Sequence, residues 1–173
     1  MAENDAQYLA EMSDDVADPD FDHLTGVITD GFVGAVGGLV GTAAMTIGLL
    51  VGASLSVFDV SEFASFATLL GLDALYPANP TAVGYAIFLL GGMIIWPLLL
   101  ASLGAYLPGE KYAIKGVSFG FVLWTGFAPA FYPGVGGLAL ALYLVVTLLA
   151  HFAYGFTLGA VFDYLSTRPK TLV

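Results

Sequence analysis

The stretch Leu138–Leu165 reads LALALYLVVTLLAHFAYGFTLGAVFDYL and is apolar for long enough to cross a lipid bilayer. A helix needs about 20 mostly apolar residues to span a hydrocarbon core of about 30 Å. The stretch carries no charge before Asp163, and its one histidine, His151, lies near the middle. Its hydrophobic residues run continuously rather than in alternation, which favours a helix over a strand of a membrane barrel. The stretch therefore predicts a membrane-spanning helix.

The composition of the whole chain indicates the same class of protein. Of its 173 residues, 58% are hydrophobic and 10% are charged, and the mean hydropathy is +0.88. Such values are typical of integral membrane proteins rather than of soluble domains. The chain contains no cysteine, which excludes disulfides, thiolate metal sites and cysteine nucleophiles.

The charged residues are mostly acidic, with 14 Asp and Glu against 4 Lys and Arg and a net charge of -10. An acidic surface repels nucleic acid, so we expect the partners to be the lipid bilayer and other membrane chains, and no nucleic acid. The acidic residues fit either an ordinary solvated tail or a protein of a halophilic cytoplasm. The scarcity of lysine favours the halophile.

The succession of apolar segments predicts an all-α integral membrane protein, a four-helix bundle with an acidic N-terminal tail and a short outer interfacial helix. We expect an acidic cytoplasmic tail over residues 1–28, a four-span membrane domain over 29–165 and a basic cytoplasmic tail over 166–173. The expected spans cover residues 29–58, 81–107, 112–131 and 138–165.

The segment 59–75 is too polar to be a span and is expected to form the interfacial helix. Asp59 and Glu62 resemble a capping box at its start. The apolar side chains of Phe63, Phe66, Leu69 and Leu70 are then expected on one side of the helix, which would lie at the membrane surface. In the second span, the pair Trp96-Pro97 predicts a kink, because proline lacks the backbone N–H.

The basic residues predict the topology. Lys111 and Lys115 lie between the second and third spans, and Arg168 and Lys170 follow the fourth. With four spans these positions share one side, and the positive-inside rule places that side in the cytoplasm. We therefore expect a multi-pass protein of the cell membrane with both termini cytoplasmic.

Glycines recur at spacings of three and four residues in three of the expected spans. At this spacing they lie on one helix face and let another backbone come close, which is how membrane helices pack. The glycines expected at helix contacts are Gly34, Gly38, Gly41, Gly48, Gly52, Gly116, Gly120, Gly155 and Gly159.

His151 and Trp96 are the candidate intramembrane polar site, because both are expected at a similar depth. An ionisable side chain inside a membrane is costly and is often functional. His151 is open to three interpretations: a structural hydrogen bond to another helix, contact with a proton or ligand, or ligation of a cofactor. A lone histidine cannot complete a metal site, so we expect no metal and no cofactor held by this chain alone.

Asp30, Lys115 and Asp163 are a candidate charge cluster on the cytoplasmic side. Lys115 opens the third span and Asp163 ends the fourth, so each opposes its own helix dipole. A pair between them would relieve both, and snorkelling of each side chain to water is the alternative. The aromatic residues of the third span could stack on a lipid or quinone, although aromatic residues at span ends are more often interface anchors.

Several motifs resemble a domain-of-unknown-function family of small four-span membrane proteins from halophilic archaea and bacteria. The most specific motif is His151-Phe152-x-Tyr154-Gly155-x-x-Leu158-Gly159, and the resemblance covers roughly residues 30–165. Further matching motifs are Gly41-Thr42-x-x-Met45, Phe58-Asp59-Val60-x-Glu62 through Leu70-Gly71-Leu72, and Lys115-Gly116-x-x-Phe119-Gly120 with Trp124. The resemblance implies a second histidine motif in the second span, where this chain has Gly84-Tyr85 and Trp96, and it implies no activity.

These features favour a non-catalytic accessory or structural subunit of a larger membrane complex, with a respiratory terminal oxidase of a halophile as the expected host. Small size, many glycines and the lack of a complete catalytic set support this expectation, and we expect no enzyme. Haem, quinone or lipid would then lie near the chain within the complex. The alternative is a small homo-oligomeric channel or carrier for a proton, ion or small solute, with His151 in its path.

Overall fold

The computed structural model describes residues 21–166, and it describes the side chains of residues 29–165. The acidic tail up to residue 20 and the basic residues Arg168 and Lys170 lie outside the described residues. The chain divides into two compact units, one up to Asp30 and the other from Gly31 onward. The second unit contains every packing contact discussed below.

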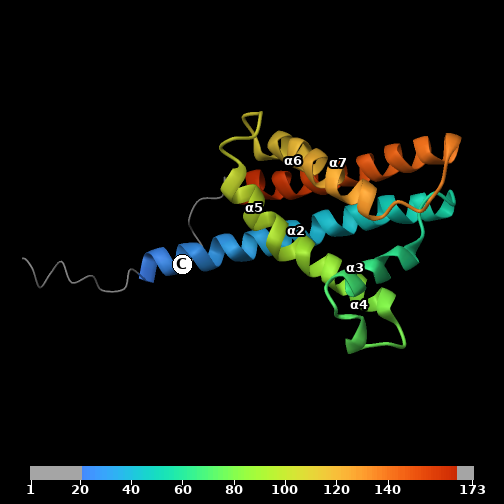
Figure 1. Cartoon of the computed structure of the whole chain (residues 1–173). Helices are drawn as coiled ribbons and strands as arrows, with labels where there is room; N and C mark the ends of the chain where they lie inside the picture. The colour runs from blue at the N-terminus through green and yellow to red at the C-terminus, as the bar shows by residue number, and fades with distance from the viewer. Residues whose placement is uncertain (1–20, 167–173) are drawn as a thin grey trace, which may run out of the picture. The chain divides into compact units, whose positions relative to one another are not determined.

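The described residues are helical and contain no strand. The α-helices are α2 (Phe21–Ser54), α3 (Phe63–Leu69), α4 (Pro80–Leu90), α5 (Trp96–Leu103), α6 (Tyr112–Ala130) and α7 (Gly137–Ser166) (Figure 1). Two 3₁₀ turns, η1 (Val60–Glu62) and η2 (Asp73–Leu75), flank α3, and a π-helical turn, η3 (Gly91–Ile95), joins α4 to α5.

Three helical segments are long and apolar enough to cross a membrane: Thr29–Ser54, Pro80–Leu103 and Gly137–Leu165. They correspond to the expected spans at 29–58, 81–107 and 138–165. The expected third span, 112–131, forms the 19-residue helix α6 and is not among these three segments. The chain is therefore an apolar helical protein suited to a lipid environment.

Helices α6 and α7 form an antiparallel pair whose backbones touch (Figure 1). A Cβ at Gly116 would collide with the carbonyl oxygen of Gly155, and a Cβ at Gly155 would collide with that of Gly116. Gly120 lies against the carbonyl of His151 in the same way. Small residues at these positions allow the two helix backbones to approach closely, as in the packing of helices inside membranes.

The glycines of α2 face the other helices of this unit. A Cβ at Gly48 would lie 2.7 Å from the Cβ of Ala150, and one at Gly41 would lie 3.0 Å from the ring of Tyr154. Gly34 meets Pro97, Gly38 meets Gly92, and Gly52 meets Phe58 and Val146. Helix α2 thus packs against both α7 and the Gly91–Leu103 segment.

The segment after α2 begins with a cap at Asp59. The Asp59 carboxylate accepts a hydrogen bond from the backbone N–H of Ser61 at 2.8 Å, and this bond lowers the pKa of the carboxyl below its ordinary value. Glu62 makes no reciprocal side-chain bond, so the cap is only half of the expected capping box.

Helix α3 packs into the protein through Phe63 and Ala67. Phe63 and Ala67 are buried, whereas Leu69 is 80% exposed and Leu70 is also exposed. Gly84 of α4 explains this orientation, because its lack of a Cβ lets α4 rest on the carbonyl of Phe63. Of the four residues expected on the apolar side, Phe63 is therefore buried, whereas Leu69 and Leu70 are exposed.

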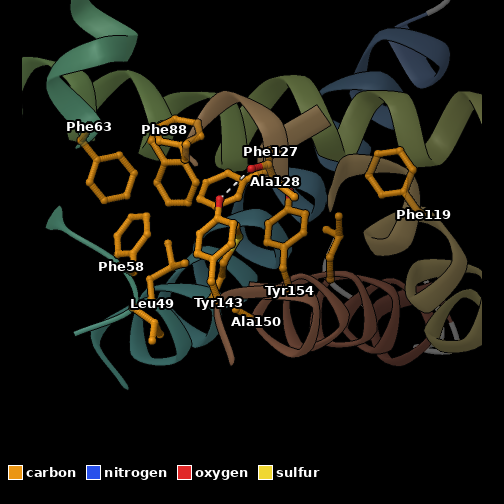
Figure 2. Close-up of a cluster of buried hydrophobic side chains, with 14 of the residues drawn as sticks. Leu49, Phe58, Phe63, Phe88, Phe119, Phe127, Ala128, Tyr143, Ala150 and Tyr154 are labelled. Carbon is orange, nitrogen blue, oxygen red and sulfur yellow. Dashed lines mark hydrogen bonds between the residues drawn. The ribbon is translucent and has the colours of Figure 1, made fainter. Parts of the chain in front are cut away.

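Phe63 belongs to an aromatic cluster that joins α3, α4 and α6. Its ring centroid lies 5.0 Å from that of Phe88 and 5.9 Å from those of Phe58 and Phe131. Phe127 stacks on Phe131 at 4.3 Å. Figure 2 shows Phe58, Phe63 and Phe88 close together at one end of the buried side chains, with Phe127 nearer the middle. Ring pairs at these distances are favourable beyond the area that they bury.

Replacement of Gly155 by alanine tests the α6–α7 contact. The added Cβ would collide with the Gly116 backbone, so we expect Gly155→Ala to lower the free energy of unfolding in detergent by about 1–3 kcal/mol. Gly126→Ala on α6 is the matched control, because its Cβ would meet nothing within 4 Å. Equal stability of the two variants would contradict the contact.

Candidate functional site

The π-helical turn η3 lies directly before the pair Trp96-Pro97. The backbone N–H of Trp96 donates to the carbonyl of Gly91, five residues earlier. The next such donor would be residue 97, but Pro97 has no N–H. The carbonyl of Gly92 therefore has no donor within its own helix. The expected kink takes the form of this local widening, a type of distortion that is frequent at functional sites.

The hydroxyl of Tyr154 on α7 supplies the missing donor. It donates to the Gly92 carbonyl at 2.8 Å, and Tyr154 is 1% exposed. From α2, Thr42 lies against Gly92 and donates its own hydroxyl to the Gly38 carbonyl at 2.7 Å. Three helical segments thus meet at the π-helical turn.

A cavity of about 310 Å³ lies beside this junction. We call it the lateral cavity, and its lining residues are Thr42, Met45, Phe66, Leu69, Phe88, Gly92, Trp96, Val122, Leu123, Gly126, Phe127, Ala130, Phe131, His151 and Tyr154. Leu69 of α3 and Val122 of α6 are exposed, at 80% and 57%, so they mark its mouth. No acidic or basic residue lines it apart from His151.

His151 lies at the middle of α7 and is 2% exposed. Its Nδ1 is 2.8 Å from the backbone carbonyl oxygen of Thr147. A carbonyl oxygen only accepts, so Nδ1 carries the proton, and in the neutral ring Nε2 then bears a lone pair. The ring also meets Phe127 edge-on, with centroids 4.7 Å apart. The imidazole is therefore fixed both in position and in tautomer.

Nε2 of His151 is open to the lateral cavity. Among the described residues, no hydrogen-bond partner contacts Nε2, and every fully buried side-chain nitrogen or oxygen has a partner. Nε2 is therefore not fully buried. His151 lines the cavity and is otherwise enclosed by the protein. The accessible side of Nε2 therefore faces the cavity.

Trp96 lines the same cavity. Its indole N–H makes no hydrogen bond within the described part of the chain, and by the same reasoning it is not fully buried. The two residues of the candidate intramembrane polar site therefore share one cavity.

A chain of hydrogen bonds holds α7 beside the site. Trp124 on α6 donates its indole N–H to the Thr147 hydroxyl at 3.0 Å, and Thr147 donates to the Tyr143 carbonyl at 2.7 Å. The Tyr143 hydroxyl donates to the Ala128 carbonyl at 2.8 Å (Figure 2). Sequence reasoning did not place Tyr143, Thr147 or Tyr154 among the candidate site residues, although Tyr154 is part of the motif that begins at His151. The spacing of four residues from Tyr143 to Thr147 to His151 was the available signal.

Two residues of the candidate charge cluster, Asp163 and Lys115, contact Tyr112 at the start of α6. Asp163 accepts from the backbone N–H groups of Tyr112 and Ala113, each at 2.9 Å, so its carboxylate caps the start of α6. This position places its charge at the positive end of the α6 dipole. The ammonium of Lys115 lies 5.1 Å from the Tyr112 ring centroid. Asp30 is exposed and belongs to the other unit.

Comparison with known proteins places the chain in a family. Residues 28–173 match a family of unknown function, DUF6789. The chain belongs to this family. No curated protein and no solved structure matches the chain. Membership in a family of unknown function confirms the expected resemblance at that level, and the match to DUF6789 contains the whole lateral cavity.

Among the described residues, no group of three or more His, Asp and Glu could hold a metal ion.

The variant Tyr154→Phe tests the bond that joins α7 to the π-helical turn. Without the hydroxyl, the Gly92 carbonyl loses its donor in a water-free environment, so we expect the free energy of unfolding in detergent to fall by about 1–2 kcal/mol. Tyr106→Phe is the control, because Tyr106 is 86% exposed. If Tyr154→Phe unfolds at the same denaturant concentration as the control, the bond does not stabilise the fold.

Proposed function

We propose that this chain is a four-span protein of the cell membrane with both termini cytoplasmic, in which α6 is the third span and α7 the fourth. A helix of 19 residues is about 28 Å long, close to the thickness of the hydrocarbon core. Helix α6 packs along α7, which is long enough to span the membrane. This packing supports placing both helices at the same depth in the bilayer. The exposed side chains of Phe121 and Val122 then contact lipid.

The proposed function is to hold a small apolar molecule in the lateral cavity without converting it. The single observation that carries this proposal is the cavity itself, whose volume of about 310 Å³ is within the range of about 300–1,000 Å³ for ligand sites. Its walls are mainly apolar and aromatic. Its mouth between α3 and α6 would face the hydrocarbon of the membrane, so an apolar molecule could enter from the lipid.

The cavity does not offer the groups of a catalyst. Acid–base chemistry generally pairs two titratable groups with different environments. His151 is the only acidic or basic residue of the lining. A fixed imidazole with one open nitrogen can orient a ligand, which fits binding better than conversion.

The cavity-filling variant Gly126→Phe tests the proposal. A Cβ at Gly126 would meet nothing within 4 Å, although Gly126 lines the cavity, so a larger side chain can enter without a backbone clash. We expect native mass spectrometry of gently extracted protein to show a bound small molecule that decreases at least about tenfold in this variant. Gly31→Phe is the control, because Gly31 also has open space and lies outside the cavity. Equal occupancy in both variants would refute the proposal.

This binding role is compatible with the accessory-subunit function that the sequence favours, in which the chain would serve a respiratory terminal oxidase of a halophile. The segment from α4 through η3 to α5 presents exposed apolar residues to its surroundings, among them Leu90, Ile94 and Leu98. Extraction from the source membrane at high salt should yield the chain in a fixed ratio with other membrane chains. A homogeneous assembly of this chain alone would instead favour the channel or carrier.

A further inference from the structure

The open nitrogen of His151 constrains what the lateral cavity can bind. Because Nδ1 donates to the Thr147 carbonyl, the neutral ring leaves Nε2 as an acceptor. A charged imidazolium would be costly at the middle of a membrane helix, and no carboxylate lines the cavity to stabilise it. The cavity therefore presents a buried acceptor and requires a donor from its occupant.

The walls around this acceptor are aromatic. Phe127 meets the His151 ring at 4.7 Å and stacks on Phe131 at 4.3 Å, and Phe66 stacks on Phe131 at 4.8 Å. These rings pack directly on one another, so a flat ring would lie against the side of this cluster that faces the cavity, where edge-to-face contacts between rings are favourable. The volume of about 310 Å³ is at the lower end of the range of ligand sites, about 300 Å³, which favours a single or fused ring over a porphyrin.

From these observations we infer that the lateral cavity binds an aromatic alcohol, a phenol or hydroquinone head group, whose hydroxyl donates a hydrogen bond to Nε2 of His151. The apolar remainder of the molecule lies among the phenylalanine rings. The indole ring of Trp96 lines the same cavity and adds a further aromatic surface for the occupant. This inference rests on the proposed function and names the class of molecule that is held.

The donor matters because an apolar occupant displaces any water from Nε2. An occupant with a hydroxyl replaces the lost hydrogen bond, whereas an ether of the same shape leaves the acceptor unpaired. The difference in affinity between a hydroxyl compound and its ether of the same shape therefore isolates the role of His151. It does not depend on how tightly the apolar part binds.

The experiment compares three probes on the full chain in lipid nanodiscs: 4-hexylphenol, its methyl ether 4-hexylanisole, and 1-decanol. Binding is followed by quenching of intrinsic tryptophan fluorescence, because Trp96 lines the cavity. We expect the phenol to bind at least about tenfold more tightly than the ether, the usual effect of an unpaired buried acceptor. We also expect the phenol to bind more tightly than the aliphatic alcohol.

Variants at His151 identify the acceptor. His151→Leu should reduce the preference for the phenol over the ether to within about twofold. His151→Gln offers an amide oxygen and should retain most of the preference. Thr125→Val is the control, since Thr125 is on α6 and lies outside the cavity. Its preference should match that of the unaltered chain.

The outcomes separate this inference from the proposed function. Equal binding of phenol and ether by the unaltered chain overturns the inference and leaves the proposed function in place. Equal binding of 1-decanol and the phenol overturns the aromatic class. If no probe binds, both proposals fail. The comparison on the unaltered chain needs no variant, so a folding defect of His151→Leu does not affect it.

Discussion

The hydrogen bond from the Tyr154 hydroxyl to the Gly92 carbonyl follows from a single constraint, that backbone polar groups in a membrane must find partners within the protein. Pro97 removes the N–H that would satisfy Gly92 in its own helix, and α7 supplies the replacement at 2.8 Å. The donor can reach only if α7 lies close to the π-helical turn. The position of α7 relative to α4 and α5 is therefore tied to one proline.

Close approach of the helices depends on the glycines. Tyr154 reaches across because Gly41 of α2 leaves room for its ring, and α2 rests on Gly92 because Gly38 has no side chain. On the other side of α7, Gly116 and Gly155 bring the α6 backbone into contact. Large aromatic side chains from α3, α4 and α6 fill the remaining space incompletely. The lateral cavity lies where glycine-mediated contact gives way to aromatic packing.

Hydrophobic periodicity and length predicted the long helices well, because membrane spans are set by bilayer thickness. The expected spans at 81–107 and 138–165 differ little from Pro80–Leu103 and Gly137–Leu165. The orientation of α3 was not predictable, because it depends on Gly84 of another helix. The cap that Asp163 makes on α6 likewise joins residues about 50 positions apart. The sequence could suggest that His151 and Trp96 share a depth, but not that they share a cavity.

The structural and functional interpretations of His151 apply to different atoms of one ring. Nδ1 makes the local bond that a purely structural histidine would make, and the Trp124–Thr147 bond holds the adjacent helical turn. A residue needed only for packing could then have buried its second nitrogen against another helix. Nε2 instead remains open to a cavity of about 310 Å³. A leucine would fill a similar space without any acceptor, whereas a histidine with a fixed tautomer presents one acceptor in one direction, which is the property a binding site for a hydroxyl requires.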